Sequence, residues 1–171
     1  MKEIQFDTKV GKKDLYHFLM RHFYTSFSGI FGIILSLGAF VFFLFNIGKR
    51  EPYQLLILLV MSSLFTIVQP LQMLQKASMQ IKRNPVFQES LHYQINEKGI
   101  RVSQNGESTT IEWDHLRKVV ETGESFLVYM TVVNANVIPK RQMDGQEEAF
   151  REIVKEKMEK GRYQFHERKS K

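Results

Sequence analysis

A short basic stretch late in the chain carries the residues that are best suited to bind an anion. In Asn136–Met143, written NVIPKRQM, two β-branched residues lead into a proline, and Lys140 and Arg141 follow at once. Adjacent cations of this kind bind phosphate or carboxylate groups. The same pattern is typical of the end of an edge strand, where the missing N–H of a proline does no harm. The sequence leaves both interpretations open.

Three further cations, Lys76, Lys82 and Arg83, follow a long apolar block and extend the first interpretation to lipid. Together with Lys140 and Arg141 they are the candidate contacts for an anionic lipid or a protein partner. A basic residue near an anionic leaflet contributes about 1 kcal/mol. If transmembrane helices already anchor the chain, such contacts would orient a domain rather than localise it.

Signatures of common enzyme classes do not occur in the sequence. There is no GxSxG elbow, glycine-rich phosphate loop or HExxH motif, and the absence of cysteine excludes a thiolate metal site or a cysteine nucleophile. Asp114 and His115 are adjacent, which is more typical of an exposed corner between strands than of a catalytic pair. We therefore expect a protein without catalytic activity, metal or cofactor.

The positive charge of the chain is too evenly mixed to predict a nucleic-acid binder. The formal net charge is +6 and the isoelectric point is about 9.5. Residues 76–171, however, carry seventeen Lys/Arg against fourteen Asp/Glu, a net charge of only +3. A protein that reads the phosphate backbone would concentrate cations on one surface, so we expect no nucleic-acid partner.

Two apolar blocks predict a transmembrane hairpin over residues 27–75. The first, residues 27–47, has 21 positions without a charge, and about 20 suffice to cross a bilayer. The second, residues 55–74, is interrupted near its end by Pro70, which should kink the helix. A buried helix of a soluble protein is the alternative for the second block. Flanking cations predict that both termini are cytoplasmic, in a multi-pass protein of a bacterial cell membrane.

Small and polar residues in these blocks indicate where helices pack together and where the membrane interface lies. Ser28, Gly32 and Ser36 recur at every fourth position, a spacing that lets two helices approach closely. They could pack against the second span or form a dimer interface between two copies. Gln69, Gln72 and Gln75 are more typical of the membrane interface than of a transport pathway.

The rest of the chain predicts a small α+β domain. Residues 1–26 should form an amphipathic cytoplasmic segment that begins with a possible short strand, residues 76–85 a linker, and residues 161–171 a basic tail. Between them, residues 86–160 alternate with period two, with a hairpin turn at Asn105–Gly106. We expect five to seven antiparallel strands and then a helix that Asp144 caps. The apolar stripe of this helix consists of Phe150, Ile153, Val154 and Met158. Such an order is typical of a barrel or split sandwich capped by a C-terminal helix.

The hairpin, the segment IEWDHLRKVVETGESFLVYM and the run VIPKRQM together resemble the YcxB-like family of bacterial membrane proteins. The resemblance extends over nearly the whole chain, and Trp113 and Ile138–Arg141 are its most specific parts. It implies a C-terminal domain with a pleckstrin-homology-like fold. It implies no particular biochemical activity.

Two functional hypotheses follow from the sequence. In the first, a cytoplasmic pleckstrin-homology-like domain binds a protein or lipid at the membrane face without catalysis. In the second, the chain is a subunit of a transporter, envelope-stress or immunity system and acts through its transmembrane helices. A homodimer is compatible with either hypothesis.

Overall fold

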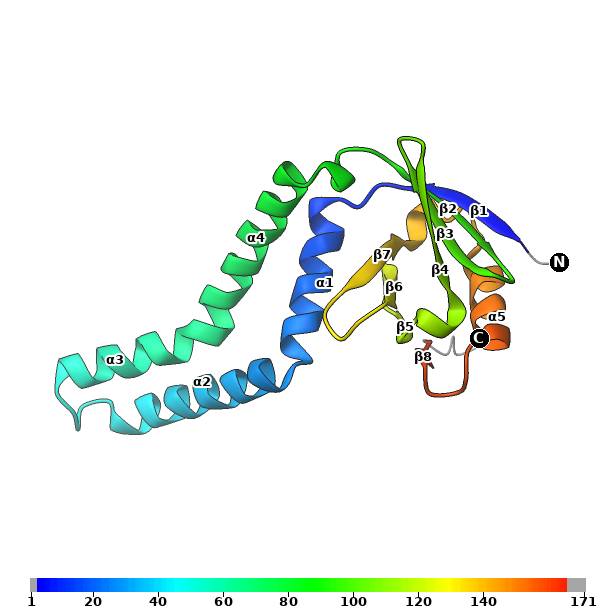
Figure 1. Ribbon diagram of the computed structural model, residues 1–171. Coiled ribbons are helices and arrows are strands. Elements are labelled where there is room, and N and C mark those ends of the chain that lie inside the picture. Colours follow the sequence, from blue (N-terminus) through cyan, green and yellow to red (C-terminus); the bar gives the residue numbers. More distant parts are fainter. Residues whose placement is uncertain (1–2, 166–171) are drawn as a thin grey trace. The chain divides into compact units, whose positions relative to one another are not determined.

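The computed structural model describes residues 3–165 and divides the chain into two compact units. We call the first the β unit; it combines the residues up to Leu15 with those from Gln80 onward. The second, the helical unit, comprises Tyr16–Met79. Figure 1 shows the elements of both units in chain order.

Two antiparallel helices, α2 (Phe27–Asn46) and α3 (Pro52–Ser63), form most of the helical unit. Helix α1 (Lys12–Tyr24) leads to α2 (Phe27–Asn46), which starts at Ser26, whose hydroxyl accepts a hydrogen bond from Gly29 N. Helix α3 (Pro52–Ser63) begins with a proline, where a missing N–H costs nothing. The predicted span 27–47 matches α2 closely, and the second apolar block belongs to a longer helix.

That longer helix runs from Pro52 to Arg83 and changes direction in its middle. A π-helical turn, Leu64–Val68, separates α3 from α4 (Gln69–Arg83), and Figure 1 shows the bend there. Pro70 lies two residues after the end of the turn and cannot donate to the carbonyl one turn earlier, which explains why regular α-helical bonding is lost at this place. The segment 76–85, predicted as a linker, is helical as far as Arg83.

Eight strands of the described residues form two four-stranded sheets in the β unit. The first sheet has the order β1-β2-β3-β4 and the second the order β7-β6-β5-β8. The strands are β1 (Ile4–Thr8), β2 (Leu91–Asn96), β3 (Gly99–Gln104), β4 (Glu107–Glu112), β5 (Lys118–Glu121), β6 (Ser125–Tyr129), β7 (Ala135–Pro139) and β8 (Tyr163–Gln164).

The predicted hairpin and the predicted edge strand are confirmed, whereas a closed barrel is not. Asn105 and Gly106 have positive φ angles of 53° and 83° and join β3 to β4. Pro139 ends β7, which lies at the edge of its sheet. A 3₁₀ turn, Trp113–His115, then separates β4 from β5, so these consecutive strands belong to different sheets and no barrel closes.

The N-terminal residues up to Leu15 belong to the β unit, and the short strand expected at the start of the segment 1–26 is β1. Strand β1 pairs with β2 along its whole length, and Phe6 stacks on Tyr93 with ring centroids 5.6 Å apart. Ile4 and Phe6 join the hydrophobic core. The pairing joins positions about 90 residues apart in sequence, for which a five-residue strand carries no local signal.

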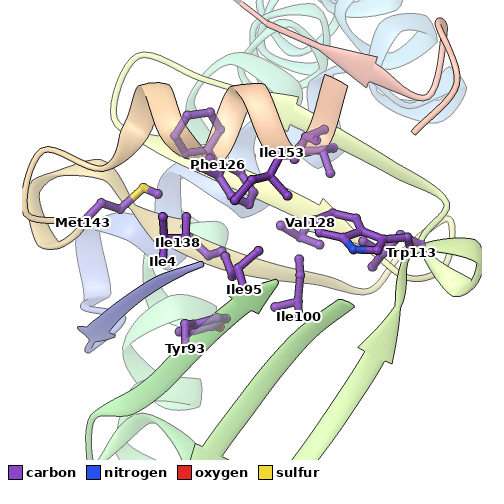
Figure 2. Packing of buried hydrophobic residues seen from close by; sticks show 14 of the residues in the cluster. Ile4, Tyr93, Ile95, Ile100, Trp113, Phe126, Val128, Ile138, Met143 and Ile153 are labelled. Atoms are coloured by element: carbon purple, nitrogen blue, oxygen red, sulfur yellow. The ribbon is translucent and has the colours of Figure 1, made fainter. Parts of the chain in front are cut away.

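The core lies between the two sheets and α5 (Glu147–Lys157). Figure 2 shows Phe126 and Ile153 near this helix, with Tyr93, Ile95 and Ile100 projecting from the first sheet. All four residues of the predicted apolar stripe are buried. The predicted cap at Asp144 is wrong, because Asp144 and Gly145 form a turn with positive φ and the helix begins at Glu147.

The predicted basic tail lies only partly within the described residues. Tyr163–Gln164 pairs as β8 in parallel with β5, so the chain after Gly161 returns to the sheet. Residues 166–171 lie outside the part of the chain that the structure describes.

Candidate functional site

The basic stretch forms a 3₁₀ turn, Lys140–Gln142, directly after β7. The backbone N–H of Lys140 donates to the carbonyl of Glu124 at 2.9 Å and fixes the start of the turn. The Lys140 Nζ lies 2.6 Å from Oε1 of Glu121, and the lysine side chain is only 18% exposed. Lys140 is therefore largely buried against a carboxylate of the same chain.

Glu121, at the end of β5, is the centre of a buried ion cluster. Its side chain is 2% exposed and receives Nη2 and Nε of Arg151 at 2.7 and 3.1 Å. Arg151 comes from α5 and also contacts Glu148 at 2.5 Å. Lys140 Nζ and Arg151 Cζ lie 5.2 and 5.6 Å from the ring centroid of Phe126. Four elements thus converge on one carboxylate.

The cluster keeps Glu121 ionised. Burial by itself would raise the pKa of this carboxyl group, but hydrogen bonds from Arg151 and Lys140, together with their charges, lower the pKa to about 2. The hydrogen bond to Glu121 raises the pKa of Arg151 in turn. A carboxylate with so low a pKa is a poor general base at neutral pH, and the ion pairs of Glu121 join β5 to α5 and to the turn after β7.

Arg141 makes a second ion pair with Asp14, across 127 residues of sequence. Its Nη1 and Nη2 lie 2.6 and 2.7 Å from the two carboxylate oxygens, and these hydrogen bonds raise the pKa of Arg141. Asp14 lies in the first turn of α1 and also accepts a hydrogen bond from Gly11 N at 2.8 Å, as in one half of a capping box. The pair joins the start of α1 to the turn after β7.

Lys140 and Arg141 therefore have carboxylate partners within the chain, which favours the structural interpretation of NVIPKRQM. The other candidate contacts, Lys76, Lys82 and Arg83, are exposed along α4. Lys76 belongs to the helical unit, and Lys82 and Arg83 belong to the β unit. The described contacts do not join these three residues to the turn after β7.

Removing Arg141 should lower the free energy of unfolding more than removing Asp14. The Asp14 side chain is fully buried, whereas that of Arg141 is 52% exposed. Arg141→Ala leaves a buried carboxylate short of donors and should cost about 2 kcal/mol. Asp14→Ala leaves an arginine that water can solvate and should cost about 1 kcal/mol.

Urea unfolding followed by the fluorescence of Trp113 measures both variants. Trp113 is the single tryptophan and lies in the β unit, where its Nε1 donates to the carbonyl of Asn96. The exposed Lys12→Ala change, on the same helical turn, is the control and should have little effect. Equal losses for the two variants would contradict the assigned burial.

The small-residue face of α2 is occupied within the same chain. A Cβ on Gly32 would lie 2.2 Å from the Phe65 ring, and Ser36 Oγ donates to the carbonyl of Met61 at 3.2 Å. Gly29 is buried against the backbone of Phe23 and Tyr24. Ser28 is exposed and does not share this face. Gly32 and Ser36 thus pack the two helices together, as the first of the two packing interpretations predicts.

The described residues contain no cluster of metal-ligating side chains. Between residues 3 and 165, no group of three or more His, Asp or Glu side chains could hold a metal ion. His115 is exposed, and its Nδ1 lies 3.9 Å from Glu112 rather than near Asp114. Trp113 is a core residue.

Comparison with known proteins supports the resemblance. Residues 95–154 match the family described as "YcxB-like protein". The chain is 29% identical over 112 residues to "Uncharacterized protein YcxB" of Bacillus subtilis (strain 168), a match that covers 64% of this chain and 60% of that relative. No solved structure matches the chain. The resemblance seen in the sequence is therefore confirmed, and residues 95–154 are the part of this chain that is similar to the YcxB-like family.

Proposed function

We propose that this chain is an integral membrane protein whose β unit binds a partner at the membrane face without catalysis. The observation that carries the proposal is the outward direction of the apolar side chains in the helical unit. In the most apolar 18-residue stretch of α2, only 22% is buried. In the corresponding stretch of the helix Pro52–Arg83, only 6% is buried. Side chains such as Phe27 and Phe45 are 85% and 71% exposed. An apolar surface of this extent needs a lipid or protein environment.

The composition of the β unit supports a hairpin rather than a single crossing. Strand β1 precedes both apolar helices and β2 follows them, yet the two strands pair. The segments before and after the two apolar helices must therefore lie on the same side of a membrane, which requires an even number of crossings. The flanking cations favour the cytoplasm for this side, since the connecting loop has only Lys49 and Arg50.

The absence of cysteine makes this topology directly testable. We expect the protein to stay in the membrane fraction after alkaline carbonate washing. In intact bacteria, a membrane-impermeant maleimide should label Lys49→Cys in the loop, and should label Glu107→Cys, at the tip of β3–β4, only after lysis. Release by carbonate would refute membrane insertion. The reverse labelling pattern would refute the orientation alone.

Binding is the mode of action that we favour for the β unit. Strand β4 lies at the edge of its sheet and offers backbone groups for a further strand. A pleckstrin-homology-like architecture remains part of this proposal, supported by the mainly antiparallel sheets and the C-terminal helix. The alternative, action through the transmembrane helices, has less support because Gly32 and Ser36 are used for packing inside the hairpin.

A further inference from the structure

The loop between β6 and β7 exposes two adjacent valines. Val132 and Val133 are 61% and 59% exposed. The turn is held in place, because Thr131 Oγ1 accepts hydrogen bonds from Val133 N and Asn134 N at 3.3 and 3.0 Å, and Met130 N donates to Asn134 O at 3.0 Å. A short, hydrogen-bonded loop therefore presents an apolar tip to its surroundings.

A basic hollow adjoins this tip. Its volume is about 700 Å³, and residues 114–118, 130–132 and 161–162 line it. The lining includes three cations, Arg117, Lys118 and Arg162, and one carboxylate, that of Asp114. Arg162 is fixed by the carbonyls of Asp114 and Leu116, and Lys118 Nζ lies 4.9 Å from the ring centroid of Tyr129. The hollow thus carries a net positive charge.

The cations of the hollow differ from those of the turn after β7. Lys140 and Arg141 are neutralised by Glu121 and Asp14. Across residues 3–165, by contrast, no acidic side chain forms an ion pair with Arg117 or Lys118. Cations that could bind an anionic surface therefore lie in this hollow, and not in the NVIPKRQM stretch, where the sequence pattern predicts them.

We infer that the β6–β7 tip and the basic hollow form a docking surface for an anionic lipid leaflet. Val132 and Val133 enter the interfacial layer, while Arg117, Lys118 and Arg162 meet the phosphates of the headgroups. The inference rests on the proposed membrane insertion and names lipid as the partner of the β unit.

The size of the surface favours lipid over a protein. A stable protein interface buries about 800 Å² on each partner, far more than two valines and a few cations provide. A domain tethered to the bilayer has a high effective concentration beside it, so weak contacts suffice. The combination of an apolar tip with unpaired cations also matches the layering of an anionic leaflet, with phosphates outside and hydrocarbon below.

A single-cysteine label tests the docking in the full-length chain. Val133→Cys with an environment-sensitive fluorophore is placed in nanodiscs of phosphatidylcholine alone or with phosphatidylglycerol, and Glu107→Cys is the control label. We expect a blue-shifted emission and quenching by nitroxide-labelled lipid at position 133 in the anionic discs. Position 107 should remain in water in both lipids. Since the surface potential is screened by salt, the shift should shrink at high ionic strength.

Charge variants separate lipid docking from other causes of the shift. Arg117→Glu with Lys118→Glu should abolish the shift. Arg117→Gln with Lys118→Gln should reduce the equilibrium constant for docking about fivefold for each charge removed. Trp113 fluorescence verifies that each variant is folded. A label at position 133 that stays in water in anionic discs would overturn the inference. A shift that ignores lipid charge but needs a second protein would also overturn it. Failure of the chain to insert would instead refute the proposed function on which it rests.

Discussion

The Glu121→Gln variant should lose about 3 to 5 kcal/mol of the free energy of unfolding of the β unit. The glutamine keeps the shape of the side chain but leaves Arg151 and Lys140, which are 9% and 18% exposed, without their shared counter-charge. Two buried or half-buried cations then face each other across an amide. Urea unfolding of the full-length protein in detergent, followed by Trp113 fluorescence, reports on this unit because the only tryptophan lies there.

The stability difference between wild type and Glu121→Gln should depend on pH. The folded pKa of Glu121, about 2, lies below its ordinary value of 4.5. Its ion pairs therefore contribute fully above pH 4.5 and are lost as pH falls towards 2, with a total on the order of 3 kcal/mol. The gap in stability between wild type and Glu121→Gln should narrow over that range, since protonated Glu121 resembles glutamine.

Measurements at pH 7, 5 and 3 test this coupling. Glu97→Gln, a change of the same chemistry at an exposed turn position, is the matched control and should follow wild type at every pH. A gap between wild type and Glu121→Gln that stays constant down to pH 3 would show that the loss comes from packing and not from charge.

Local patterns in the sequence were sufficient to predict much of the β unit. Asn105 and Gly106 accept positive φ angles, so the β3–β4 hairpin can be placed from two residues. The apolar spacing of Phe150, Ile153 and Val154 predicts the buried face of α5 because helical periodicity is a local property. The edge position of Pro139 follows from a similarly local argument.

The features that the sequence could not predict depend on long-range pairing. Strand β1 finds its partner only after the whole helical unit, and Asp14 and Arg141 are 127 residues apart. A charge count treats Lys140 and Arg141 as free, although burial of Glu121 and Asp14 determines their role. A local hint did exist, since Asp14 lies three residues after Gly11 at a helix start, which is typical of a capping residue. The carboxylate at the end of the apolar run Val119–Val120 was a second hint.

Gly32→Val should weaken the packing of the helical hairpin by about 3 kcal/mol. A Cβ at this position would lie 2.2 Å from two atoms of the Phe65 ring and 2.7 Å from Cγ, near the base of that side chain. The ring cannot withdraw without moving the π-helical turn Leu64–Val68, because Phe65 N donates to Ser36 Oγ at 3.4 Å and Phe65 O accepts from Tyr24 Oη at 2.6 Å. The loss of far-UV circular dichroism during a titration with SDS measures the effect.

Gly38→Val provides the matched control on the same helix. Nothing lies within 4 Å of a Cβ built on Gly38, and replacing glycine in a helix raises its intrinsic helix propensity, so this variant should be neutral or slightly more stable. Adding Phe65→Ala to Gly32→Val should restore part of the lost stability, since the smaller side chain makes room for the new one. If Gly32→Val and Gly38→Val behave alike, close approach at Gly32 does not hold the hairpin together. If Gly32→Val instead changes only the concentration dependence of unfolding, the face belongs to a contact between two copies.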